Sequence, residues 1–226
     1  MVFQLTRLSF FPVAAAEYER LEDLDGVPIL LHAPGSGTDA IASAIENRLG
    51  IRFASRDYIE GSENRAVALM TGAAPAAILD LANRDTILAM AGEDFHALPM
   101  FEIKASDEVL FVGLEALQSH AEAVDFLVKV VDQTWHDLFD DHTVVSRELA
   151  EPTVAGPLPE DVRSNLDLWM LRAVEAGIFP PSPHDKKGPA QADLEWYLPN
   201  LSQVEAGREI ENFWDFGPIE AASSLH

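Results

Sequence analysis

The chain has 226 residues, 48% of them hydrophobic, and is therefore long enough to build a hydrophobic core. It carries 38 acidic against 15 basic residues, and its formal net charge of −23 repels phosphate backbones and anionic lipid surfaces. It contains no cysteine, which excludes disulfides, thiolate metal sites and a cysteine nucleophile. We therefore expect a folded protein that binds neither nucleic acid nor membranes.

Apolar runs in this chain are short. None reaches about eighteen residues, because the longest are bounded by charged residues such as Asp107 and Glu115. The first residues lack the small-residue cleavage site of a secretory signal. These observations predict a cytoplasmic location.

The first hundred residues alternate apolar runs with turn signals. Strands are predicted at residues 3–11 (closed by Pro12), 28–32, 51–54 and 66–70. Helices are predicted at residues 38–49 and 74–82. Thr38 or Asp39 would cap the first of these helices, and Gly50 would end it. The pattern indicates an α/β or α+β fold with a mixed sheet and flanking helices.

The strongest helical pattern runs from Glu115 to Phe139, after a predicted hairpin of residues 100–103 and 109–112. Its apolar residues fall on one stripe: Val124, Leu127, Val131, Trp135 and Leu138. If this stripe is buried, replacing Leu127 or Val131 by Ala would destabilise the protein by about 2 to 4 kcal/mol.

A connector rich in Pro and Gly, residues 151–159, divides the chain into an α/β body at 1–150 and a remainder at 151–226. In the remainder we expect a helix over 159–176 that Gly177 ends. An irregular C-terminal segment would follow and pack on the body through aromatic anchors such as Trp196 and Trp214.

One motif carries definite chemistry, the loop Gly35-Ser36-Gly37-Thr38 between a predicted strand and a predicted helix. Free backbone N–H groups and the positive end of a helix both favour an anion, so the loop is a candidate phosphate cradle. Together with Leu49-Gly50-Ile51, Phe53 and Arg56-Asp57-Tyr58-Ile59, it resembles the opening of the cytidylate-kinase-like P-loop kinases over residues 28–59.

The resemblance implies phosphoryl transfer from a nucleotide with magnesium. The lysine of the Walker motif is absent, and Thr38 and Asp39 follow Gly37 instead. A degenerate loop that binds nucleotide, or an ordinary tight turn between a strand and a helix, is also compatible with these residues.

A second constellation lies on the long predicted helix, where Asp132, His136 and Asp140 are spaced four residues apart. Two carboxylates and an imidazole are possible ligands of a divalent metal ion. The alternative is a solvated helix face without metal, and no H-E-x-x-H pattern supports a hydrolytic metal centre.

The excess of acidic residues leads to the main functional hypothesis. We expect a non-enzymatic binding protein, similar to an inhibitor or immunity protein, that engages a basic protein partner and needs no cofactor. The first alternative is a degenerate P-loop protein that binds a nucleotide with magnesium or transfers phosphate. The second is an oligomeric structural or assembly component, possible if the aromatic C-terminal segment packs against another copy.

Overall fold

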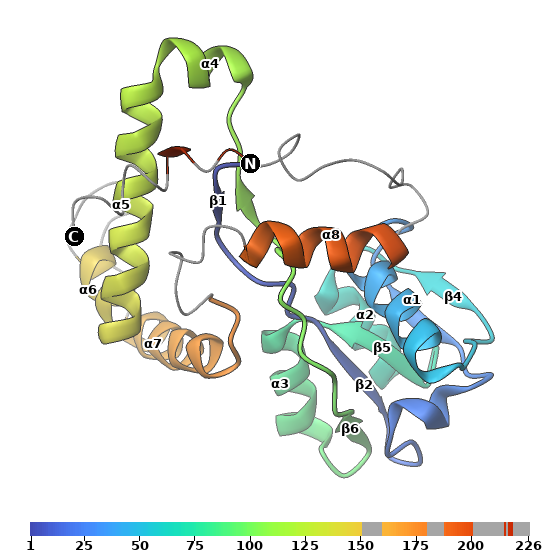
Figure 1. Cartoon of the computed structure of the whole chain (residues 1–226). Coiled ribbons are helices and arrows are strands. Elements are labelled where there is room, and N and C mark those ends of the chain that lie inside the picture. The colour runs from blue at the N-terminus through green and yellow to red at the C-terminus, as the bar shows by residue number, and fades with distance from the viewer. Residues whose placement is uncertain (151–159, 180–187, 201–214, 216, 219–226) are drawn as a thin grey trace. The chain divides into compact units, whose positions relative to one another are not determined.

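The computed structural model describes residues 1–150, 160–179, 188–200, 215, 217 and 218. Contacts divide the chain into two compact units, drawn in Figure 1. Unit 1 comprises Met1–Arg7, Lys104–Ala192 and Glu209–His226, and unit 2 comprises Leu8–Ile103 and Asp193–Arg208. The predicted boundary between residues 150 and 151 adjoins residues outside the described set and stays a prediction.

Unit 2 contains a five-stranded mixed sheet with the strand order β4-β3-β5-β2-β6. Its strands are β2 (Phe11–Ala15), β3 (Ile29–Leu31), β4 (Arg56–Tyr58), β5 (Ala76–Leu79) and β6 (Phe95–Ala97). Strand β3 pairs in parallel with β4 and β5, whereas β2 pairs antiparallel with β5 and β6. The predicted mixed α/β architecture is therefore confirmed.

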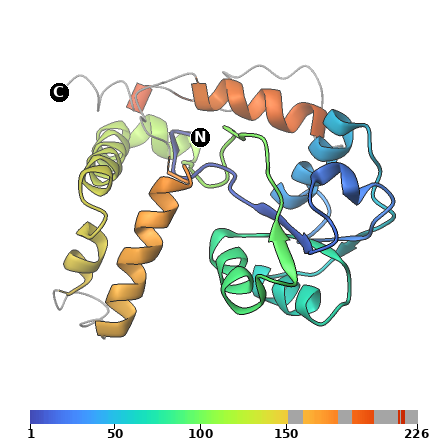
Figure 2. The same ribbon diagram turned by 90° about the horizontal axis from the view of Figure 1, so that it is seen from below.

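Helices cover both faces of this sheet. Helix α1 (Gly37–Leu49) lies on one face, and α2 (Ser62–Met70) and α3 (Leu81–Ala91) lie on the other (Figure 2). Parallel strands that are covered on both sides read as continuous apolar runs, and the sequence of β3 is Ile-Leu-Leu with every residue buried. The core between the sheet and α2 and α3 contains Val13, Leu30, Ala66, Leu69, Ala74, Ala77, Leu79 and Ile87.

Several predictions for this unit hold. Strand β3 lies inside the predicted residues 28–32, and α1 ends at Gly50, whose φ of 71° is left-handed. The N-cap of α1 is Ser36, not Thr38 or Asp39. The short 3₁₀ helix Leu21–Leu24 precedes β3.

Other predictions for this unit are wrong. Residues 66–70 belong to helix α2, whereas β5 occupies the middle of the predicted helix 74–82. In α2 the buried Ala66 and Leu69 are three residues apart, which is a helical spacing. In β5, Ala76 and Ala77 suit a strand that is covered closely on both faces, although alanine favours helices.

The N-terminal strand also differs from the prediction. Residues 3–11 are divided between β1 (Phe3–Gln4) in unit 1 and the start of β2 in unit 2. Pro12 lies inside β2, where its carbonyl accepts a hydrogen bond from Leu98 N, and does not end a strand. Likewise, the strand expected at 51–54 begins only at Arg56.

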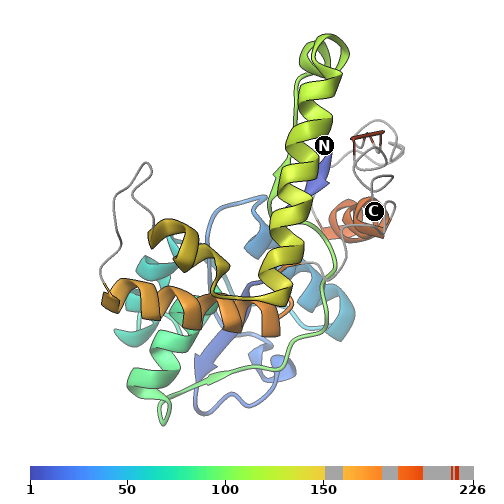
Figure 3. The ribbon, with the colours of Figure 1, turned by 90° about the vertical axis from the view of Figure 1, so that its left-hand side faces the viewer.

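Unit 1 is largely helical and has a two-stranded sheet of β1 and β7 (Val109–Leu110), which pair antiparallel. The hairpin predicted from residues 100–103 and 109–112 is therefore wrong, because β7 pairs with the N-terminal strand. The helices are α4 (Leu114–Ser119), α5 (Ala121–Asp140), α6 (Val144–Ala150) and α7 (Glu160–Glu175). Helix α7 lies across the C-terminal end of α5 (Figure 3), and Gly177, with φ 70°, follows it as expected.

The long predicted helix is thus two helices, and its buried face is displaced from the predicted stripe. The buried residues of α5 are Val124, Val128, Asp132 and Leu138, whereas Leu127 is 43% exposed. Val128 packs with Val2 and Phe3, and Val131 is partly buried beside them. The expected loss on replacing Leu127 is therefore corrected to a small one.

The C-terminal segment is more regular than predicted where the structure describes it. Helix α8 (Gly188–Asn200) contains Trp196, which is only 5% exposed and contacts Phe101 in unit 2. Arg48 lies 4.0 Å from the Phe101 ring centroid and 5.7 Å from that of Trp196. Trp196 is therefore buried, as predicted, whereas Trp214 lies outside the described residues. Within the described part of the chain, no helix has the length and apolarity needed to cross a membrane.

Candidate functional site

The loop between β3 and α1 is shaped by its own polar side chains. Ser36 caps α1 by accepting a hydrogen bond from Asp39 N at 3.4 Å. Asp39 Oδ2 in turn accepts the N–H of Gly35 at 2.9 Å, and Gly35 has a left-handed φ of 74°. One amide of the predicted cradle is therefore occupied by a carboxylate of the protein itself.

Two hydroxyl groups in this loop are hydrogen-bonded to each other. Thr38 Oγ1 accepts the N–H of His32 at 2.9 Å and lies 3.0 Å from Ser36 Oγ. A single hydrogen bond between the hydroxyls uses one of their two protons. Either hydroxyl can be the donor in this bond, and Ser36 Oγ also accepts the N–H of Ala33 at 3.4 Å. One hydroxyl proton of the Ser36–Thr38 pair therefore remains available to a ligand.

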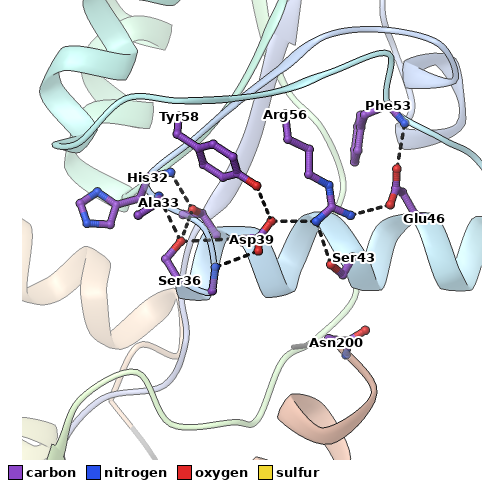
Figure 4. Close-up of polar contacts among 12 residues, drawn as sticks. His32, Ala33, Ser36, Asp39, Ser43, Glu46, Phe53, Arg56, Tyr58 and Asn200 are labelled. Carbon is purple, nitrogen blue, oxygen red and sulfur yellow. Dashed lines mark hydrogen bonds and ion pairs between the residues drawn. The ribbon is translucent and has the colours of Figure 1, made fainter. Parts of the chain in front are cut away.

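An ion-pair network fixes α1 to β4 (Figure 4). Arg56 Nη1 lies 2.7 Å from Asp39 Oδ1 and 3.0 Å from Ser43 Oγ, and Arg56 Nη2 lies 2.5 Å from Glu46 Oε2. Burial lowers the pKa of Arg56, but hydrogen bonds to Glu46 and Asp39 raise it by more, so the net pKa lies above its usual value. The charge of Asp39 is thereby neutralised on the inner side of the loop.

Tyr58 completes this network, since its hydroxyl donates to Asp39 Oδ1 at 3.2 Å. Burial and the adjacent Asp39 raise the pKa of Tyr58 above its usual value. The phenol is therefore neutral at physiological pH and acts as a hydrogen-bond donor.

Three loops meet at the carboxyl edge of the parallel strands and are hydrogen-bonded to one another. The N–H of Gly61, before α2, donates to His32 Nδ1 at 3.3 Å, so Nδ1 is unprotonated and His32 presents its other nitrogen as N–H. The N–H of Asp80, before α3, donates to Ser62 Oγ at 3.0 Å. The loops after β3, β4 and β5 therefore form one connected surface, termed here the edge site.

Helix N-termini provide the donors of the edge site. Helices α1, α2 and α3 all begin at this edge, and the first amides of a helix have no intrahelical acceptor. Within the described residues, the amides of Gly37 and Thr38 make no hydrogen bond to another protein group. These amides and the Ser36 hydroxyl can bind an anion.

The structure brings the residues of the predicted phosphate loop together but not the three predicted metal ligands. Gly35, Ser36, Gly37 and Thr38 do lie together between a strand and a helix, where they were expected. On α5, Asp132 is buried and lies 3.9 Å from His136 Nε2, whereas Asp140 is exposed. The described residues contain no cluster of three or more His, Cys, Asp or Glu able to hold a metal ion.

Comparison with known proteins identifies the fold. No protein-family model and no curated protein sequence matches this chain. A solved protein from Bordetella bronchiseptica RB50 superposes with a TM-score of 0.68 at 15% identity, over 99% of this chain and 74% of that one. The periplasmic sulfonate-binding protein SsuA from Methylobacillus flagellatus KT gives 0.65 at 14% identity, over 100% and 68%.

A third solved structure includes a ligand in its description. The alkanesulfonate-binding protein SsuA from Xanthomonas axonopodis pv. citri, bound to MOPS, superposes with a TM-score of 0.55 at 14% identity, over 89% of this chain and 70% of that one. At such identities the likeness establishes that this chain shares its fold with these proteins, and nothing further.

These structures overturn the functional predictions made from the sequence. The resemblance to P-loop kinases is wrong, since the solved structures that share the fold are sulfonate-binding proteins. The same finding contradicts an acidic inhibitor with a basic protein partner, a phosphotransferase and an oligomeric assembly component. It also contradicts the cytoplasmic location, because the fold is that of proteins described as periplasmic. The excess of acidic residues indicated a partner that the fold does not support.

Several residues around the edge site were assigned no role from the sequence, and Arg56 was named only within the resemblance to P-loop kinases. Arg56 and Glu46 are ten residues apart and meet only because α1 packs beside β4. Arg65 is 1% exposed and lies directly before residues 66–70, which were read as a strand but belong to helix α2. The signal that could have found it is an arginine in the first turns of a segment that starts with Gly61-Ser62-Glu63, a helix start.

Proposed function

We propose that this protein is a solute-binding protein that holds a small organic anion, of the sulfonate type, at the edge site. The observation that carries this proposal is that, among the described residues, the amides of Gly37 and Thr38 have no hydrogen-bond partner and the neighbouring Ser36–Thr38 hydroxyl pair has one proton to spare. Both lie at the carboxyl edge of parallel strands. In open α/β sheets, ligands bind outside the carboxyl ends of the strands. Helix N-termini at that position attract negative charge.

The ion pairs around the loop support an anionic ligand. Asp39 would repel an anion, but Arg56 lies 2.7 Å from its carboxylate and neutralises it. Its other oxygen is engaged by Gly35 N. A tetrahedral head group with several oxygens matches three donors from a single loop, namely two amides and one hydroxyl.

The fold suggests the biological setting. Proteins of this fold include sulfonate-binding components of ABC transporters. The present chain would then act outside the cytoplasmic membrane, deliver its solute to a membrane permease and catalyse no reaction itself. The fold alone supports this setting, whereas the geometry of the loop supports an anion at the edge site.

The proposal is tested with a matched pair of variants at one position. Gly37 is the first residue of α1, and Ser36 before it has an extended conformation, with φ −78° and ψ 170°. Proline is tolerated at this position and lacks only the N–H, so Gly37→Pro removes one ligand donor and keeps the helix. Gly37→Ala retains the N–H and serves as the control.

Binding of methanesulfonate, ethanesulfonate and MOPS to the full chain is measured by calorimetry and by thermal shift. We expect binding to the parent protein and to Gly37→Ala, and binding about tenfold or more weaker for Gly37→Pro. Sulfate and inorganic phosphate distinguish an organic anion from a simple inorganic one. If none of the sulfonates binds the parent protein, or if Gly37→Pro binds them as well as Gly37→Ala, the proposal is wrong.

A further inference from the structure

We infer that Arg65 determines charge specificity at the edge site. Arg65 is a buried cation, and its charge makes the edge site prefer an anion to a neutral molecule of the same shape. This inference rests on the proposed function. Arg65 is a positioning and specificity residue, since a ligand would sense its field without touching it.

The position of Arg65 is fixed by backbone carbonyls. Its Nε donates to Ile78 O at 2.9 Å, near the end of β5, and its Nη1 donates to Ile59 O at 3.0 Å, directly after β4. Strand β3 lies between β4 and β5 in the sheet, and Ile59 N bonds to Leu31 O at the end of β3. The guanidinium therefore bridges the two outer parallel strands at the level where the middle one ends and the β3–α1 loop begins.

The other arginines of unit 2 differ from Arg65 in their partners. Among the described residues of Leu8–Ile103, each of the others contacts a carboxylate or an aromatic ring: Arg20, Arg48, Arg52, Arg56 and Arg84. The hydrogen bonds of Arg65 go to carbonyl oxygens instead. A carbonyl orients a guanidinium but does not cancel its charge.

The electrostatics agree with this picture. Burial lowers the pKa of Arg65, and the more distant Asp80 and Glu63 raise it by less. The protein's own carboxylates thus compensate the buried charge only in part. A buried charge that lacks a direct counterion is unfavourable, and an anion bound at the adjacent edge would offset part of that unfavourable energy.

A change of charge at position 65 tests the inference through selectivity, which a purely structural role would leave unchanged. Methanesulfonate and methanesulfonamide have nearly the same shape, but only the first is an anion at neutral pH. We expect the ratio of their affinities to fall about tenfold or more in Arg65→Gln and to be largely retained in Arg65→Lys. Arg20→Gln, which removes an arginine paired with Glu22 between β2 and β3, at the opposite edge of the sheet, is the control and should keep the parent ratio.

A second measurement covers the case in which Arg65→Gln does not fold. In the parent protein, the Nε–H resonance of Arg65 should shift on saturation with methanesulfonate and not with methanesulfonamide. A parent-like affinity ratio in folded Arg65→Gln would overturn the inference while leaving the proposed function intact. So would an Arg65 Nε–H resonance that does not shift when methanesulfonate binds. Failure of the parent protein to bind any sulfonate would instead remove the proposed function itself.

Discussion

Arg56 and Asp39 form an ion pair, with 2.7 Å between Nη1 and Oδ1, that joins the first turn of α1 to the start of β4. The same guanidinium binds Glu46, about two turns further along the same face of α1. Asp39 also holds Gly35 N, so the shape of the β3–α1 loop depends on a charge pair seventeen residues apart in sequence. This pair therefore links the packing of a helix to the geometry of the edge site.

Replacing Arg56 by Gln should lower the free energy of unfolding by about 2 kcal/mol, because two partly buried carboxylates lose their counterion. It should also weaken anion binding, because Asp39 then bears an uncompensated charge beside the loop. Chemical denaturation and calorimetry measure the two effects. The matched control is Arg52→Gln, since Arg52 is 71% exposed and 3.8 Å from Glu46, and its loss should alter stability by less than about 1 kcal/mol. Equal effects of the two substitutions would contradict this prediction.

Two substitutions of Ser36 separate its roles as cap and as ligand donor. Ser36→Ala removes both and should destabilise the protein by about 1 kcal/mol as well as weaken sulfonate binding. Ser36→Asp keeps a good N-cap but replaces the hydroxyl donor by a carboxylate, so stability should be retained while binding is lost. Thermal unfolding and calorimetry on both variants check this. Tight sulfonate binding by Ser36→Asp would show that the anion lies elsewhere.

A substitution of Glu63, unlike those of Arg56 and Ser36, should strengthen the binding of an anion. An ideal Cβ on Gly61 would lie 2.5 Å from Glu63 Oε1, so this carboxylate lies over the loop that precedes α2 and opposes an anion there. Glu63→Gln should therefore strengthen methanesulfonate binding about threefold at low salt, and the gain should shrink at high salt. Glu93→Gln, between α3 and β6 at the other edge of the sheet, is the control. An unchanged affinity in Glu63→Gln would exclude an electrostatic role for this residue.

The sequence predicted the parts of the fold in which local pattern and tertiary environment agree. Ile29, Leu30 and Leu31 are apolar and buried on both sides, and Gly50 ends α1 in the left-handed conformation that favours glycine. The mixed sheet with flanking helices follows from such segments. The glycine loop was also recognised as a possible anion site from its position between a strand and a helix.

Failures occurred where tertiary context overrides propensity. Ala76 and Ala77 belong to a central strand and are buried there, although alanine favours helices, and no local signal reports this. Asp132 is 1% exposed although its charge predicted a wet face. Arg56 and Asp39, and the carbonyls around Arg65, come together only on folding. The charge of the whole chain misled the functional prediction, because it describes the surface and not the binding site.

The corrected buried face of α5 gives a stability test. Val128 is fully buried against Val2 and Phe3, so Val128→Ala should lower the free energy of unfolding by about 2 kcal/mol through loss of contacts and a residual cavity. Leu127 is 43% exposed, and Leu127→Ala should have an effect below about 1 kcal/mol. Denaturant titration of both variants measures the difference. A larger loss for Leu127→Ala would restore the stripe predicted from the sequence.

Asp141, between α5 and α6, should make stability depend on acid pH. Its carboxylate accepts hydrogen bonds from Thr143 Oγ1 at 2.6 Å, from Arg147 Nη1 at 2.6 Å and from Thr143 N at 3.0 Å. The Thr143 hydroxyl, then Arg147 and the Thr143 amide, lower the pKa of Asp141 to about 2. A carboxyl group whose pKa is lower in the folded protein stabilises the fold above its unfolded pKa of about 3.9, and this stabilisation disappears as pH falls towards 2.

Asp141→Asn should therefore be less stable than the parent protein at pH 6, and the difference in melting temperature should narrow between about pH 4 and pH 2. Other carboxylates titrate in the same range, so the comparison with Asp141→Asn isolates the contribution of this one. Asp57→Asn is a suitable control, because Asp57 is exposed and its carboxylate accepts a hydrogen bond from Ser55 without an ion pair among the described residues. NMR titration of the Asp141 carboxyl carbon gives the pKa directly. A midpoint near 4, or a melting difference that stays constant over this range, would show that Thr143 and Arg147 do not hold the carboxylate in solution.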